Sequence, residues 1–338
     1  MVKKKKQIKK KSKQKNVLNM VEALNQALFQ EMNQDEDVVI LGEDVGLDGG
    51  VFRVSDGLQK KYGKERVIDT PLAESGIVGF SIGMAAAGLK PIAEIQFSGF
   101  LYPAVNQIIS HASRLRNRTR GAYTCPLVIR APCGGGIRAL EHHSESMENI
   151  FIHTPGIKVV MPSTPSDAKG LLISAIRDPD PVIFYEPKRV YRSIKEDIPK
   201  ESYEIPLGKA RISREGTDVS ILTWGSVVKD CNEVADSLKE KVSVEVIDLR
   251  TLKPLDIETV IESVKKTGRV VIVHEAPKTS GFGAELIALI NEKALLDLQA
   301  PVIRVTGFDT IFPLYKLEKH YMPNHDRIMK GINDVLNY

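Results

Sequence analysis

Residues 66–96 read RVIDTPLAESGIVGFSIGMAAAGLKPIAEIQ, and they contain a complete strand–helix–strand unit. The apolar residues of 66–69 predict a short strand, and a second strand is predicted at 91–96. Between them, residues 74–89 are almost all apolar or glycine, which predicts a buried helix. A strand that is followed by a helix and another strand is the building unit of a parallel sheet.

The same alternation continues in both directions from this unit. Its strands are continuous apolar runs, and such runs favour a mostly parallel sheet that is covered on both faces. The further strands are expected at 37–41, 126–130, 157–161 and 181–185, and the further helices at 17–33, 55–62, 101–119 and 165–177.

The periodicity lapses at residues 191–210, which are charged, contain prolines and are interpreted as a linker. A second alternating series follows, with strands expected at 218–223, 244–248, 270–274 and 302–305. We therefore predict two α/β domains: a doubly wound parallel-sheet domain at 17–190 and a second α/β domain at 211–338. Ligands in such sheets bind beyond the carboxyl ends of the strands.

Charge is distributed unevenly along the 338 residues. Residues 1–15 hold nine lysines and no acid, and without these nine lysines the net charge of +4 becomes −5. A lysine run cannot bury itself, so residues 1–16 are predicted to be a disordered, solvated tail. Contact with an acidic partner or nucleic acid is the alternative, although we expect no specific nucleic-acid site.

Targeting signals and membrane spans are missing from the sequence. The tail lacks the apolar core of a signal peptide, and no apolar run approaches the roughly 20 residues that cross a bilayer. Cys125, Cys133 and Cys231 are odd in number and not at metal-ligand spacing, which indicates reduced thiols. We expect a cytoplasmic protein that contacts no membrane.

Glu74 is the first candidate for chemistry. Thr70 and Pro71 look like the N-cap and first residue of a helix, so Glu74 can be explained as a first-turn acid that the helix dipole favours. Its downstream neighbours are almost all apolar, with three glycines at helical spacing that permit close packing. A carboxyl group in such dry surroundings favours its neutral form, and a neutral carboxyl group can protonate a ring nitrogen.

A glycine triplet at 134–136 and the sequence EHHSES at 141–146 form the second candidate. Glycines after a strand let the backbone approach a ligand. Adjacent histidines point in different directions, so a shared metal ion is not expected. One histidine can act as a general acid or base; the alternative is a solvated polar loop.

A third candidate is FSGFLYP at 97–103, just after a predicted strand. Aromatic residues there usually belong to the core. An aromatic ring at a strand end can also pack against a flat heterocycle.

Eight motifs follow one another along the chain: GEDVG (42–46), GGVFRVS (49–55), DTPLAESGIVGFSIGMAAAG (69–88), AEIQFSGFLYPAVNQI (93–108), HHSES (142–146), PGIKVV (155–160), DAKGLL (167–172) and PVIFYEPKRVYR (181–192). In this order they resemble the beta subunits of thiamin diphosphate-dependent 2-oxo acid dehydrogenases, which are the decarboxylating components of the pyruvate and branched-chain complexes. The resemblance covers the chain from residue 17 to the end and omits only the tail.

The resemblance implies roles for three residues and a transketolase-like fold with a pyrimidine-binding and a C-terminal-like domain. Glu74 matches the carboxyl group that bonds the aminopyrimidine ring, and Phe100 matches the aromatic residue that packs on that ring. His143 matches a histidine that helps to transfer the acyl group to a lipoyl arm. Glu145 stands where the family has Gln, and His142 adds a second imidazole, which leaves the hydrogen-bond partners of His143 open.

The resemblance also implies a structural potassium site built mostly from backbone carbonyl oxygens. A rigid turn at 177–181 (RDPDP) suits a hard cation; a capped helix end without an ion is the alternative. The matching positions are Cys125, Leu127 and Val128, with Ala175, Asp178 and Asp180.

A diphosphate-binding Gly-Asp-Gly motif is missing, and the nearest string is LDGG at 47–50. The resemblance therefore implies an alpha subunit that holds Mg²⁺ and the diphosphate in an α₂β₂ heterotetramer. The second domain is then expected to dimerise and to dock the lipoyl acyltransferase core. HEAP (274–277) and GFG (281–283) are expected to serve packing and subunit contact.

The predicted function is that of a beta subunit that is active only with its alpha subunit. The stretches AEIQF, FLYPAVNQI and EPKRVYR favour branched-chain 2-oxo acids as substrate, with pyruvate as the alternative. Two other readings remain: a half enzyme like transketolase or deoxyxylulose synthase, and a non-catalytic scaffold that binds partners.

Overall fold

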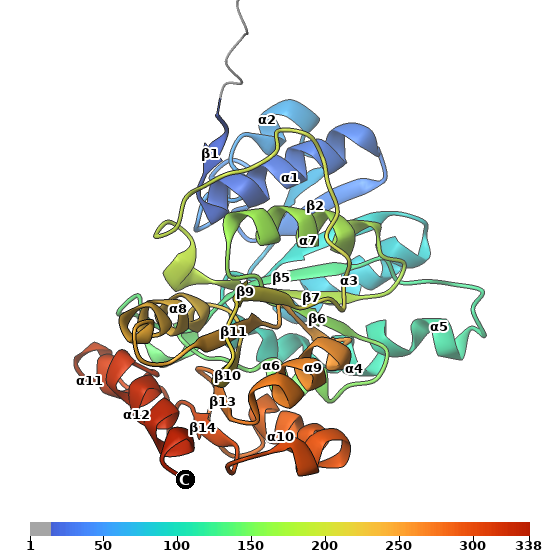
Figure 1. Cartoon of the computed structure of the whole chain (residues 1–338). Coiled ribbons are helices and arrows are strands. Elements are labelled where there is room, and N and C mark those ends of the chain that lie inside the picture. Colours follow the sequence, from blue (N-terminus) through green and yellow to red (C-terminus); the bar gives the residue numbers. More distant parts are fainter. Residues whose placement is uncertain (1–14) are drawn as a thin grey trace, which may run out of the picture.

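The computed structural model describes residues 15–338, so most of the predicted lysine tail lies outside the described residues. Two sheets of mostly parallel strands (Figure 1) confirm the predicted two-domain α/β fold. The first sheet comes from residues 38–187 except for its edge strand β12 (Thr251–Lys253), which lies between strands of the second sheet in sequence. The first sheet has seven strands and the second has five.

The first sheet has the strand order β12-β6-β7-β5-β4-β2-β3, and only β12 is antiparallel to its neighbour. The quoted stretch 66–96 forms β3, α3 and β4, which cross over β2. The strands are β2 (Val38–Gly42), β3 (Val67–Asp69), β4 (Lys90–Glu94), β5 (Val128–Cys133), β6 (Lys158–Val160), β7 (Val182–Pro187) and β12 (Thr251–Lys253).

Helices cover this sheet on both faces, with α1 against α7 on one of them (Figure 1). The α-helices are α1 (Met20–Gln34), α2 (Leu58–Tyr62), α3 (Glu74–Ala86), α4 (Val105–Ser110), α5 (Leu115–Arg118), α6 (Glu148–Ile152) and α7 (Pro165–Arg177). Short 3₁₀ segments are η1 (Ser98–Ala104), η2 (Ala112–Arg114), η3 (Glu141–His143) and η4 (Lys188–Val190).

Helix α3 begins at Glu74, as the predicted stretch 74–89 does, and later than the Thr-Pro capping signal indicates. The backbone N–H of Thr70 donates to the Gly42 carbonyl oxygen at the end of β2 (3.0 Å), so Thr70 prolongs the strand pairing. Its Oγ1 has no hydrogen-bond partner within the described residues, so it does not cap the helix. The N-cap is Ala73, which provides no side-chain cap, and Glu74 is the first helical residue. The predicted N-cap at Thr70 is therefore wrong.

The single helix predicted at 101–119 is also wrong, because this stretch is divided among η1, α4, η2 and α5. Pro103 lies inside η1 and has no N–H for an α-helical hydrogen bond. His111, at the end of α4, leaves helical geometry with φ −123° and ψ −64°.

The second sheet has the order β14-β13-β10-β11-β9, with β9 antiparallel at its edge. Its strands are β9 (Arg211–Arg214), β10 (Val219–Thr223), β11 (Val244–Asp248), β13 (Val270–Val273) and β14 (Ile303–Val305). The remaining elements are α8 (Val227–Leu238), α9 (Ile257–Thr267), α10 (Phe282–Ala294), η5 (Leu295–Asp297), α11 (Tyr315–Tyr321), α12 (His325–Leu336) and the short antiparallel pair β1 (Val17–Leu18) and β8 (Glu196–Asp197).

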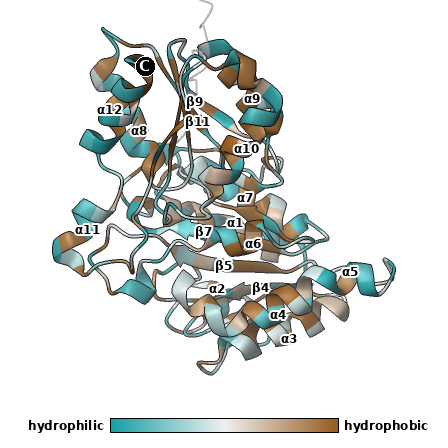
Figure 2. Cartoon of the chain, turned by 90° about the horizontal axis from the view of Figure 1, so that it is seen from below, coloured by the Kyte–Doolittle hydropathy of each residue, from teal (hydrophilic) through white to brown (hydrophobic). Residues whose placement is uncertain are grey.

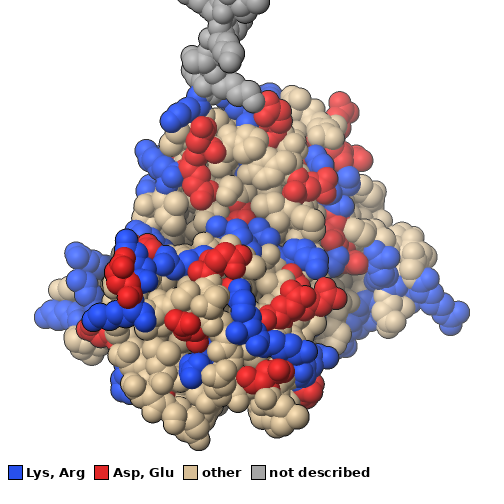
Figure 3. Space-filling model, in the orientation of Figure 1, with Lys and Arg blue, Asp and Glu red and all other residues tan. Residues whose placement is uncertain are grey.

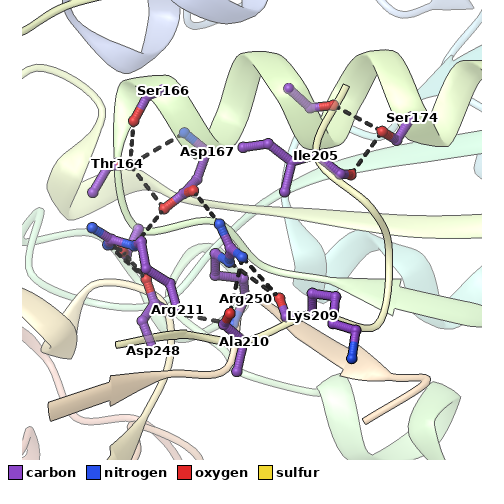
Figure 4. A network of polar contacts seen from close by, with 12 residues as sticks. Thr164, Ser166, Asp167, Ser174, Ile205, Lys209, Ala210, Arg211, Asp248 and Arg250 are labelled. Atoms are coloured by element: carbon purple, nitrogen blue, oxygen red, sulfur yellow. Dashed lines mark hydrogen bonds and ion pairs between the residues drawn. The ribbon is translucent and has the colours of Figure 1, made fainter. Parts of the chain in front are cut away.

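The two domains share a buried polar junction (Figure 4). The carboxylate of Asp167, in the first turn of α7, contacts Arg250 Nη1 (2.7 Å) and Arg211 Nε (3.1 Å). Arg211 also pairs with Asp248 at the end of β11 (3.0 Å). Ion pairs with partners on both sides hold the second domain against the N-terminus of α7.

On the outside, charges of both signs are interspersed over the face shown in Figure 3. Within residues 15–338, no helix combines the length and apolar character that a bilayer span requires. Cys125, Cys133 and Cys231 are buried free thiols.

Candidate active site

The predicted site residues follow the carboxyl ends of parallel strands of the first sheet. Glu74 follows β3 and Phe100 follows β4, and Glu43, which the sequence did not single out, comes directly after β2 between these strands. The segment with His143 follows β5. Because carboxyl ends of parallel strands meet at one edge of the sheet, these segments converge there.

Glu74 is half-buried at the start of α3. It lies close enough to Glu43 that its charge adds to the effect of burial, and both raise the pKa of the Glu43 carboxyl group. Leu72 and Phe80, near Glu74 in sequence, are 79% and 65% exposed. The dry enclosure expected around Glu74 is therefore incomplete within this chain.

His143 is held between two aromatic rings. Its imidazole meets Phe97 edge to face with ring centroids 4.3 Å apart, and Phe100 in the same way at 5.2 Å. Phe97 and Phe100 contact each other at 5.6 Å. The structure thus brings together Phe100 and His143, two residues that lie 43 positions apart.

The packing of α3 connects Glu74 to this aromatic group. Ile77 and Val78 of α3 belong to the same hydrophobic core as Leu101 and Ala104 of η1, the segment that carries Phe100. The helix that begins at Glu74 is therefore fixed against the segment that holds the aromatic ring.

The second histidine and the substituted glutamate lie apart from the His143 ring nitrogens. The His142 side chain is 57% exposed, with Nδ1 3.9 Å from Glu141 Oε1. Glu145 lies beside Tyr102, where burial and then the Glu145 charge raise the pKa of the Tyr102 hydroxyl. Within the described residues, neither Nδ1 of His143 nor Oε2 of Glu145 has a hydrogen-bond partner, so Glu145 does not orient the histidine.

A buried ion network that the sequence did not predict lies behind the site. Arg130 of β5 bonds Glu94 of β4 (2.5 Å) and Glu186 of β7 (2.6 Å). The Tyr191 hydroxyl donates to Glu186. Burial raises the pKa of Glu94, and Arg130 opposes that rise. Three adjacent strands of one sheet supply these charges. Their proximity follows from the strand order and not from the sequence around each residue.

The two segments of the predicted potassium site lie side by side. The Cys125 N–H donates to the Pro179 carbonyl oxygen (3.1 Å). Both carboxylates of the site are already paired with cations, so an ion would have to bind carbonyl oxygens. The pairs are Arg116 Nε with Asp180 (2.6 Å) and Lys158 Nζ with Asp178 (2.5 Å).

The fold and this site define a transketolase-like chain, and comparison with known proteins agrees. The family model of the transketolase pyrimidine-binding domain matches residues 16–193, and that of the transketolase C-terminal domain matches residues 208–328. A solved structure described as a split-gene transketolase, an inactive beta4 tetramer, superposes with a TM-score of 0.78. The superposition covers 95% of this chain and 98% of the solved chain, and the two sequences are 22% identical. This likeness concerns the fold alone.

Two curated relatives match nearly the whole chain. The pyruvate dehydrogenase E1 component subunit beta of Acholeplasma laidlawii is 55% identical, with 94% of this chain and 98% of the relative covered. The subunit of the same description in Bacillus subtilis is 49% identical, with 95% and 99% covered. The chain belongs to the family of beta subunits of thiamin diphosphate-dependent 2-oxo acid dehydrogenases.

Proposed function

We propose that this chain is the beta subunit of an enzyme that oxidatively decarboxylates pyruvate together with an alpha subunit. The observation that carries the proposal is the 55% identity to a pyruvate dehydrogenase subunit over almost the full length of both chains. The grouping of Glu74, Phe100 and His143 at one edge of the first sheet supports it.

Branched-chain 2-oxo acids, the substrates favoured by the sequence motifs, are not supported, and pyruvate fits the relatives better. The motifs AEIQF and EPKRVYR begin in the last residues of β4 and β7, where Glu94 and Glu186 hold Arg130. A buried ion network of the sheet therefore explains the charged residues of these stretches, which give little information about the substrate.

The described residues are compatible with the pyrimidine half of thiamin diphosphate. Thr70 Oγ1 and His143 Nδ1 are buried without a hydrogen-bond partner among residues 15–338, so two segments of the candidate site, the one before Glu74 and the loop after β5, each keep a polar atom free for a ligand. The bound cofactor supplies the nucleophilic carbon and the electron sink for decarboxylation. Glu74 exchanges a proton with the pyrimidine nitrogen, and Phe100 offers its ring face to the heterocycle.

The alpha subunit is proposed to hold Mg²⁺ and the diphosphate, because this chain has no motif for either. Exposed Leu72 and Phe80 beside Glu74 are then covered by that subunit, which completes the enclosure. The chain alone is expected to be inactive. A lipoyl acyltransferase as the docking partner, and a cytoplasmic location, stay predictions that co-purification and cell fractionation test.

His143 is proposed to act as a proton donor or acceptor when the acyl group moves to the lipoyl arm. In the complex rebuilt with its alpha subunit, His143→Ala should slow lipoyl reduction roughly a hundred- to ten-thousandfold. Decarboxylation with an artificial electron acceptor should fall far less. Rates measured side by side for wild type and variant decide this role, and an equal loss in both reactions would remove it.

A structural potassium ion at the carbonyl oxygens of the 125–128 and 175–180 segments is also proposed. Its support is the proximity of these segments and the turn between Asp178 and Asp180. Replacing K⁺ by Na⁺ in the buffer should lower the melting temperature of the complex. Identical melting curves in the two salts would argue against the ion.

A further inference from the structure

We infer that two glutamates of the second domain, Glu275 and Glu318, position the loop that carries His143. This inference rests on the proposed role of His143 in acyl transfer. Glu275 follows β13 and Glu318 lies on α11, so both belong to the part of the chain for which the sequence predicts only packing and subunit contact.

The glycine triplet 134–136 lies against residues beyond its own loop at three points. A Cβ atom on Gly134 would lie 2.7 Å from Glu275 Oε2, and one on Gly135 would lie 2.4 Å from Phe312 Cζ. A Cβ on Gly136 would lie 2.6 Å from the Arg189 side chain. At these distances a larger residue would force the neighbouring side chains to shift. Glu275 and Phe312 belong to the second domain, so Gly134 and Gly135 serve the close approach of the two domains, whereas Arg189 lies in the first domain.

The loop amides donate to the two glutamates. Gly135 N–H bonds Glu275 Oε2 at 3.0 Å, and Gly136 N–H bonds Glu318 Oε1 at 2.6 Å. The Arg138 N–H also faces the Glu318 carboxylate at 3.3 Å. Gly134, Gly136 and Arg138 all have positive φ, and backbone turns of this kind can point N–H groups toward anions. Glu318, which is only 5% exposed, is the anion for the Gly136 and Arg138 amides.

The loop returns from this contact to the site. The Gly134 N–H donates to the Glu145 carbonyl oxygen (3.2 Å), and Ser98 Oγ donates to the same oxygen (2.7 Å). A small cavity lined by 144–147 on one side and by Phe312 and Tyr321 on the other continues the contact between the domains. Both ends of the His143 loop therefore touch the second domain.

His143 depends on this support because no side chain inside the described residues bonds its Nδ1. The flanking Phe97 and Phe100 restrict the ring by contact alone. The placement of the ring is then set by the loop backbone, and Glu318 is the buried charge that holds this backbone. It acts as a positioning residue.

The test uses Glu318→Ala and Glu318→Gln in the beta chain of the rebuilt α₂β₂ complex. A matched control is Glu258→Gln, since the Glu258 side chain is 82% exposed on α9. For Glu318→Ala we expect a rate of lipoyl reduction that is roughly ten- to hundredfold lower than in wild type. The rate of decarboxylation with the artificial electron acceptor should fall by a factor that is at least fivefold smaller. Glu318→Gln retains a carbonyl acceptor and should recover part of the rate, and the control should match wild type.

Hydrogen exchange of the loop provides a readout besides activity. The Gly136 and Arg138 amides should exchange at least tenfold faster in Glu318→Ala, while those of β10 stay unchanged. Unchanged exchange, or an equal fall of both reactions, would overturn the inference. If His143→Ala impairs lipoyl reduction and Glu318→Ala does not, the positioning role of Glu318 is wrong and the proposed role of His143 stands. If His143→Ala has no effect on lipoyl reduction, the proposed role of His143 in acyl transfer is wrong.

Discussion

At the scale of single residues, the surroundings of Glu74 are built only in part by this chain. Glu74 is the first residue of α3 and the acid of its first turn. The apolar side chains of Leu72 and Phe80, near it in sequence, are largely exposed. A partner subunit that covers these side chains would complete the enclosure around the carboxyl group.

His274 permits a prediction about pH at the same scale. Burial lowers its pKa to about 4 from 6.5, and the ring stacks on Trp224 with centroids 5.0 Å apart. A depressed histidine pKa contributes stability that is complete above pH 6.5 and is lost as the pH falls toward 4. Between pH 7.5 and pH 5, wild type should therefore lose about 2 kcal/mol of unfolding free energy that His274→Gln retains.

Urea unfolding followed by circular dichroism at the two pH values measures this difference. The two chains must be compared at each pH, because other groups titrate in both. Parallel pH dependence in wild type and variant would show that His274 is not the responsible group.

Local motifs single out Glu74, Phe100 and His143 as candidate site residues, and the roles assigned to them stay predictions. The interaction partners that the fold brings to a residue could not be predicted from the sequence. Arg130 meets its two carboxylates across 36 and 56 residues of sequence, and no local pattern records that β4, β5 and β7 are neighbours.

At the scale of elements, local signals decided how well each helix could be predicted. The bounds predicted for α7, 165–177, are those observed, because Thr164 caps the helix and Pro165 opens it. At α3 the same Thr-Pro signal misled, because the backbone at Thr70 continues the pairing with β2 and Thr70 Oγ1 has no hydrogen-bond partner within the described residues. An N-cap acts through its side-chain oxygen, so a Thr-Pro pair marks a helix start only where the backbone that follows is helical.

Helix α3 also permits a prediction about assembly. It is apolar on nearly every side, and Gly76, Phe80 and Gly83 form an exposed stripe along it. Figure 2 shows α3 and α4 at the edge of the molecule with hydrophobic residues in brown. A helix that is apolar all round is normally buried, and the proposed alpha subunit is the partner that covers it.

Phe80→Glu should therefore leave the fold of the beta chain unchanged and weaken its association with the alpha subunit at least tenfold. Analytical ultracentrifugation of the mixed subunits measures the association, with Leu296→Glu in η5 as a control at a side chain that is 98% exposed. Normal assembly of Phe80→Glu would place the alpha subunit elsewhere.

At the scale of the whole molecule, the chain is a two-domain unit whose second domain reaches into the site of the first. The ion pairs of Asp167 and the glutamates on the glycine loop make the domain contact polar and specific. The boundaries proposed for the domains stay predictions. The fold class and family could be predicted from the order of motifs, whereas the interdomain contacts depend on residues that no motif relates.

Glu74 is proposed to activate the pyrimidine ring of thiamin diphosphate in a site shared with an alpha subunit. The most direct test is pyruvate turnover by the rebuilt complex with Glu74→Gln, beside Glu65→Gln at an exposed position. We predict that Glu74→Gln assembles normally and turns over at least a hundredfold more slowly, while Glu65→Gln matches wild type. Full turnover by an assembled Glu74→Gln complex would contradict the account.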